Sequence, residues 1–212
     1  MNTIRTTLSM GLLLACSACA TLDEGTCRTG DWRQIGYQDG LRGHGTGRLA
    51  EHQKSCSAHG VAADNNAWHV GYVQGQGQYC TAANGYREGR DGASYGDVCP
   101  PASDAEFRPA WRDGRELASR VASLRTLERE LDQIGETLAE DDRRSDAHIA
   151  AVRSGRQPPA AELLGPGERR RAERDFDQRA ADHAQLLDEI SQRDAELSAR
   201  YQVAPLRLEA RR

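Results

Sequence analysis

The sequence predicts an all-α protein in which a small disulfide-stapled helical domain is followed by a long antiparallel helical, coiled-coil hairpin. Three observations predict this class: cysteines confined to residues 27–99 of the exported part, glycines four apart beside tyrosines in the same segment, and leucines seven apart after residue 104. Hydrophobic residues make up 38% of the 212-residue chain and charged residues 28%, which suits elongated, solvent-exposed helices. The net charge of -4 is small, and the arginines alternate with acids instead of clustering into a patch. We therefore expect no nucleic-acid partner.

The first eighteen residues read as a lipoprotein signal peptide. Arg5 supplies a positive start, and the apolar run from Leu8 to Ala15 is too short to span a bilayer. Small residues ending in a cysteine then form the pattern that lipoprotein signal peptidase recognises. Cys19 is the predicted lipidation site because cleavage there leaves an even set of thiols, although Cys16 remains an alternative.

The predicted anchor also indicates a location. Residues 19–26 form a lipidated tether, and the acyl chains, palmitate among them, bind the protein to a membrane. Ala20 follows the cysteine, so the aspartate that signals inner-membrane retention is missing at this position. We therefore expect a lipid anchor in the outer membrane, facing the periplasm.

Four cysteines remain after cleavage, and an oxidising compartment favours two disulfides. If three helices alternate in direction, the expected pairs are Cys27–Cys80 and Cys56–Cys99; the other two connectivities stay open. A metal site is the rival interpretation, since His52 and His59 flank Cys56 at ligand-like spacing. A full four-ligand set is missing from the pattern, so we predict no metal.

The helices of this domain, residues 27–103, are predicted from capping residues. Asp31 should cap a helix that runs to about Lys54, and Asp64 one that runs to about Tyr79. Asn84 should open a third, shorter helix that ends before residue 99.

A glycine-tyrosine pattern recurs in these helices, at Ile35–Gly40, Val70–Gly75 and Asn84–Gly89 and, more loosely, at Ala110–Gly114. Glycines four apart share one helix face, and each costs about 1 kcal/mol relative to alanine there, so a compensating contact is expected. Close approach of two helices is one explanation. The other is a glycan- or peptide-binding groove, whose ligand candidates are Tyr37, Trp68, Tyr72 and Tyr86.

Six short motifs lie in this part of the chain: Cys27-x3-Asp31-Trp32, Gly36-Tyr37-x2-Gly40, His52-x3-Cys56, Tyr79-Cys80-Thr81, Asn84-Gly85-x3-Gly89 and Ser94-Tyr95-x3-Cys99-Pro100. With them, residues 16–115 resemble a widespread proteobacterial lipoprotein family catalogued only as a domain of unknown function. The resemblance implies a Gram-negative envelope lipoprotein with paired cysteines and no assigned activity. The long charged tail departs from the shorter relatives, so a role placed there is not implied.

The tail is predicted to form the coiled-coil hairpin, with helices over 104–153 and 168–203 and a loop over 154–167 that contains three prolines. The first helix would be about 75 Å long at 1.5 Å per residue. Its stripe consists of Leu117, Leu124, Leu131 and Leu138, with Leu127 and Ile134 interleaved. The second stripe consists of Phe176, Ala180, His183, Leu187, Ile190, Leu197 and Tyr201.

The sequence contains no recognisable catalytic motif, such as G-x-S-x-G, H-E-x-x-H or a P-loop. We therefore expect no catalytic residue, no cofactor and no enzyme activity. A membrane-anchored envelope scaffold is the favoured interpretation, with another envelope protein, a second copy or peptidoglycan as its partner. A periplasmic module that binds a glycan or peptide in the tyrosine-glycine grooves is the alternative.

Overall fold

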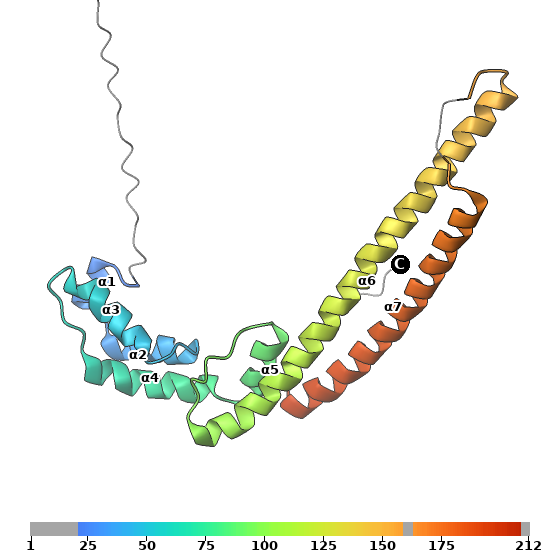
Figure 1. The fold of residues 1–212 in the computed structure, drawn as a ribbon. Helices are drawn as coiled ribbons and strands as arrows, with labels where there is room; N and C mark the ends of the chain where they lie inside the picture. The colour runs from blue at the N-terminus through green and yellow to red at the C-terminus, as the bar shows by residue number, and fades with distance from the viewer. Residues whose placement is uncertain (1–20, 159–162, 209–212) are drawn as a thin grey trace, which may run out of the picture. The chain divides into compact units, whose positions relative to one another are not determined.

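The computed structural model describes residues 21–158 and 163–208, whose regular secondary structure is entirely helical, with no strand (Figure 1). The predicted all-α class is confirmed. The chain divides into two compact units, one up to Tyr79 and one from Cys80 onward. Cys19 and the alternative Cys16 lie outside the described residues. The helices are α1 Glu24–Thr29, α2 Trp32–Leu41, α3 Gly47–Ser57, α4 Asn65–Tyr79, α5 Ala82–Arg90, α6 Pro101–Arg153 and α7 Pro166–Tyr201.

The first unit contains α1 to α4. Asp31 caps α2 by accepting hydrogen bonds from two backbone N–H groups, as expected. The single helix expected from there to Lys54 is wrong, because Gly43 adopts a φ of 68° that only glycine favours. The chain reverses after this residue and resumes as α3. Asp64 caps α4 as predicted, through the N–H of Ala67.

Each unit contains one disulfide. Cys27 is bonded to Cys56, with Cα atoms 5.3 Å apart, and Cys80 is bonded to Cys99, with Cα atoms 5.6 Å apart. Two disulfides from these four cysteines are confirmed, but the pairing Cys27–Cys80 and Cys56–Cys99 is wrong. The break at Gly43 is the physical reason, because it folds α3 back so that its end meets α1. The boundary between the two units, after Tyr79, lies inside the expected domain 27–103.

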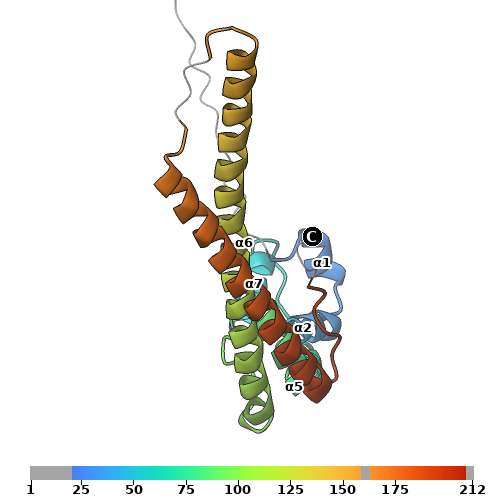
Figure 2. The same ribbon diagram turned by 90° about the vertical axis from the view of Figure 1, so that its right-hand side faces the viewer.

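The second unit is built from α5, α6 and α7. Thr81 caps α5 by accepting the N–H of Asn84, so the helix begins at Ala82, two residues before Asn84. In Figures 1 and 2, α6 and α7 run side by side in opposite directions, which is the predicted hairpin. None of the described helices combines the length and the apolar character needed to cross a membrane.

The seam between α6 and α7 follows the predicted stripes. Six buried residues form the core of this seam. Val203, Leu206 and Leu208, which follow α7, pack against the same core. These six are Tyr86, Ala110, Leu117, Leu124, Ile190 and Leu197.

The far end of the hairpin is held by polar contacts. Asp141 accepts the backbone N–H of Leu164 at 2.8 Å and pairs with Arg169 at 2.7 Å. These bonds lower the pKa of Asp141, the backbone hydrogen bond contributing most. The start of α7 is therefore fastened opposite Asp141, and residues 142–153 of α6 continue for about 18 Å beyond that point.

Candidate functional site

Helices α2 and α4 cross in direct backbone contact. A Cβ atom added to Gly71 would lie 1.8 Å from the carbonyl oxygen of Arg33, and one added to Gly75 would lie 2.0 Å from that of Tyr37. From the other side, a Cβ on Gly36 would lie 1.9 Å from the Trp68 oxygen. Real Cβ contacts do not become this short, so these positions require glycine. The helix-packing explanation of the glycine pattern is thus confirmed here.

Helices α5 and α6 repeat this arrangement. Cβ atoms added to Gly85 and Gly89 would lie 2.5 and 2.1 Å from the carbonyl oxygens of Phe107 and Trp111. A Cβ on Gly114 would lie 2.3 Å from the Tyr86 oxygen. The glycines of α2 and α4 therefore correspond in register to those of α5 and α6.

The turns after α2 and α5 also match. Gly43 and Gly92 each stand three residues after the last packed glycine, with φ angles of 68° and 83°. An aromatic side chain of the paired helix then donates to the carbonyl of the next residue: the Tyr72 hydroxyl to His44 at 2.7 Å, and the Trp111 indole to Ala93 at 3.0 Å. Two copies of one helix-pair motif therefore follow each other along the chain.

The four aromatic groove candidates are separated by the fold. Trp68 and Tyr72 are buried together in the first unit, with ring centroids 4.7 Å apart. Tyr86 is buried in the second unit, and only Tyr37 is partly exposed. Burial explains the raised pKa of the Tyr72 hydroxyl. Three of the four side chains therefore pack inside the protein and do not form the walls of an open groove.

A buried histidine-aspartate pair joins the helices of the first unit. Asp39 of α2 accepts hydrogen bonds from His52 Nε2 and from the Trp68 indole, both at 2.9 Å. The Arg48 guanidinium lies 3.8 Å from the second carboxylate oxygen and supplies a compensating positive charge. Because the His52 residue is only 2% exposed, this cluster serves as a polar joint between α2, α3 and α4.

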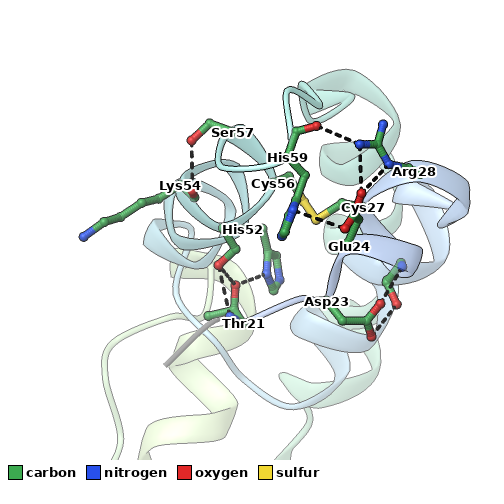
Figure 3. Close-up of a disulfide and its surroundings, with 12 residues drawn as sticks. Thr21, Asp23, Glu24, Cys27, Arg28, His52, Lys54, Cys56, Ser57 and His59 are labelled. Carbon is green, nitrogen blue, oxygen red and sulfur yellow. Dashed lines mark hydrogen bonds and ion pairs between the residues drawn. A yellow bond between two sulfur atoms is a disulfide. The ribbon is translucent and has the colours of Figure 1, made fainter. Parts of the chain in front are cut away.

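The residues before α1 are tied to the same joint (Figure 3). The Thr21 hydroxyl lies 2.7 Å from His52 Nδ1, and its backbone N–H donates to the Ser55 hydroxyl at 3.0 Å. The Cys27–Cys56 disulfide fastens α1 to α3 beside these contacts. The chain is therefore fixed to the first unit from Thr21 onward, two residues after the predicted lipidation site.

A second buried carboxylate, Asp194 of α7, organises the second unit. It accepts the hydroxyl of Tyr86 at 2.9 Å and lies 3.7 Å from the guanidinium of Arg90. Burial first, and this carboxylate second, raise the pKa of Tyr86 to about 12. Tyr201 stacks on the Tyr86 ring with centroids 5.1 Å apart. These contacts hold the end of α7 against α5.

The segment that contains both glycine-packed pairs is also the segment that matches a protein family. Residues 31–116 match the DUF2799 family. The family is described as a protein of unknown function. No curated protein and no solved structure matches the chain.

The matched segment includes all four glycine motifs, Asp39 and His52, whereas Thr21 precedes it and α7 follows it. The sequence interpretation missed the role of Asp39. The available signal was an acidic residue in the middle of a helix whose glycines require close contact with another helix. The sequence singles out His52 as a possible metal ligand and gives no sign of its bond to Asp39. Among the described residues, no group of three or more His, Cys, Asp or Glu side chains is placed to hold a metal ion.

Proposed function

We propose that this protein is a lipid-anchored envelope scaffold, held by acyl chains on Cys19 in the outer membrane and facing the periplasm. The observation that carries the proposal is the attachment of Thr21 to α3. Two residues of chain span about 7 Å at most, so an acylated Cys19 would hold the first unit close to the lipid headgroups. The two disulfides support export, because such bonds persist in oxidising compartments.

Mass spectrometry of the mature protein, extracted from membranes, tests the anchor. We expect an N-terminal acylated Cys19, and a Cys19→Ala variant should be missing from the membrane fraction. A Thr21→Val variant is the matched control: it should remain membrane-bound, while protease cleaves the chain before α1 faster. Unprocessed protein in the cytosol with reduced thiols would contradict the proposal.

The hairpin is the surface through which this scaffold would contact another envelope component. Ile149 and Val152 lie fourteen residues after Gly135 and Leu138 and so continue the α6 seam, yet they are 44% and 57% exposed. These two residues lie beyond the point where α7 begins, so α7 does not cover them.

A photo-crosslinking residue placed at position 149 in intact cells tests this surface. The control position is Ala122, which is also exposed on α6 but lies away from the hairpin end. We expect an adduct from position 149 only, whose mass distinguishes an envelope protein, a second copy and peptidoglycan. Equal labelling from both positions would count against a specific contact.

A further inference from the structure

The two copies of the glycine-packed helix pair differ on one side. Counting from the glycines, Arg33, Tyr37 and Leu41 of α2 correspond to Ala82, Tyr86 and Arg90 of α5. Gln74 and Gln78 of α4 correspond to Asp113 and Leu117 of α6. These two sets occupy the same flank of each pair. We call the set in the first unit, on α2 and α4, the open flank.

In the second unit α7 covers this flank. Tyr201 stacks on Tyr86, and its hydroxyl donates to Asp113 at 2.7 Å. Asp194 accepts the hydroxyl of Tyr86, and Leu197 is buried in the same cluster. One stripe of α7, formed by a carboxylate, an aliphatic residue and an aromatic residue, therefore covers this flank and accepts or donates its hydrogen bonds.

In the first unit the open flank has no such cover among the described residues. Leu41 is 37% exposed, and both Gln74 and Gln78 are exposed. The Tyr37 hydroxyl has no hydrogen-bond partner in the part of the chain that the structure describes, whereas its counterpart Tyr86 donates to a carboxylate. The opposite flank of the same pair is closed by the joint around Asp39.

We propose that the open flank binds an amphipathic helix of a partner protein, and that this helix carries a carboxylate, an aliphatic and an aromatic residue at the spacing of Asp194, Leu197 and Tyr201. The carboxylate accepts the Tyr37 hydroxyl, and the aromatic ring stacks on the Tyr37 ring. This inference names a partner class for the proposed scaffold, but it does not depend on the lipid anchor.

Charge and stoichiometry favour such a partner. Arg33 is exposed on the open flank, where its guanidinium donates to Gln74 at 3.2 Å, while α4 carries no Asp, Glu, Lys or Arg. The surface is therefore positive and complements an acidic helix. In a second copy, as far as the described residues show, the α7 stripe is already occupied by its own α5 and α6.

The probe is a labelled peptide of residues 186–208, which contains the α7 stripe. It is titrated, with fluorescence anisotropy as the readout, into the oxidised mature chain with Cys19→Ser, which has no lipid. We expect saturable binding that weakens at least about tenfold in a Leu41→Glu variant, since buried anchor residues dominate such interfaces. A peptide with Tyr201→Ala should weaken to a similar extent.

Val73→Glu is the matched control. Val73 is 52% exposed on α4 and stands two residues from both Gly71 and Gly75, which places it on the far side from α2. The affinity of the Val73→Glu variant for the peptide should stay within about twofold of that of the parent chain. Circular dichroism of both variants confirms that the exposed substitutions leave the fold intact.

Each other outcome overturns the proposal. Without saturable binding the flank is not a helix site. If Leu41→Glu has no effect, the peptide binds elsewhere, as it would by exchanging with the chain's own α7. If sedimentation shows a dimer that Leu41→Glu dissociates, a second copy covers the flank. Binding to anionic vesicles that the same variant abolishes would identify a membrane surface instead. None of these readouts requires acylation of Cys19. A negative result would therefore contradict the helix site without contradicting the proposed anchor.

Discussion

Alanine at position 71 should destabilise the first unit strongly. The new Cβ would lie 1.8 Å from the carbonyl oxygen of Arg33 and 2.8 Å from the backbone nitrogen of Tyr37. Both obstacles are backbone atoms of a helix and cannot turn aside as a flexible side chain can. To reach an ordinary contact of 3.4 Å, α2 and α4 must separate by roughly 1.5 Å.

The size of the effect follows from two opposing contributions. Alanine gains about 1 kcal/mol of helix propensity over glycine, whereas overpacking costs about 1–3 kcal/mol and more where rigid elements must move. Separation also weakens the dispersion contacts along both helices. We expect a net loss of about 2 kcal/mol, and a fall in Tm of about 10 °C or more, for a unit of this size.

Gly77→Ala on the same helix is the control. A Cβ at Gly77 would meet no atom within 4 Å, so this variant keeps the propensity gain and should raise Tm by a few degrees. Differential scanning calorimetry of the oxidised mature chain measures both variants. If Gly71→Ala proves as stable as Gly77→Ala, the close approach of α2 and α4 is refuted.

Three further predictions follow from the contacts described above. Peptide mapping without reduction should recover the pairs Cys27–Cys56 and Cys80–Cys99, and any peptide joining the two units would contradict the fold. Tyr86→Phe should cost about 1.5–3 kcal/mol in denaturant unfolding, because it removes one of the hydrogen bonds that satisfy the buried Asp194 carboxylate, which keeps only Ser198 and the Leu206 N–H as donors among the described residues; Tyr37→Phe should be close to neutral. Because folding raises the pKa of Tyr86 from 10.0 to about 12, the resulting stability is full below pH 10.0 and is lost as the pH rises through about 12. Tyr86→Phe should therefore reduce the loss of stability over this alkaline range, measured with denaturant; an unchanged slope would refute the assignment.

Features that depend on local patterns were predicted from the sequence. The leucines of α6 and the stripe of α7 report a helix pair because seven-residue spacing has few other structural solutions. Asp31 and Asp64 mark helix starts through their own side-chain hydrogen bonds, so their effect is also local. The glycine pattern indicated close helix packing for a similar reason, since the cost of glycine in a helix needs a compensating contact.

Features that depend on one chain reversal were not predicted. Gly43 is one of several glycines in its segment, and nothing in the residue sequence distinguishes a left-handed glycine from a helical one such as Gly40. A continuous helix to Lys54 would place Cys56 far from Cys27, and this assumption leads to the wrong pairing. The buried joint around Asp39 depends on the same reversal, because it needs α3 to return to α2.

The order of the disulfides has a consequence for biogenesis. Among the described residues, each cysteine bonds to the next one along the chain, Cys27 with Cys56 and Cys80 with Cys99. A polypeptide that enters an oxidising compartment with its N-terminus first exposes the partners of each bond consecutively, and an oxidant that links thiols in order of arrival produces the native pairs directly. In such a compartment the first unit could close before the second has emerged, and the native pairs would form without an exchange of bonds between the two units.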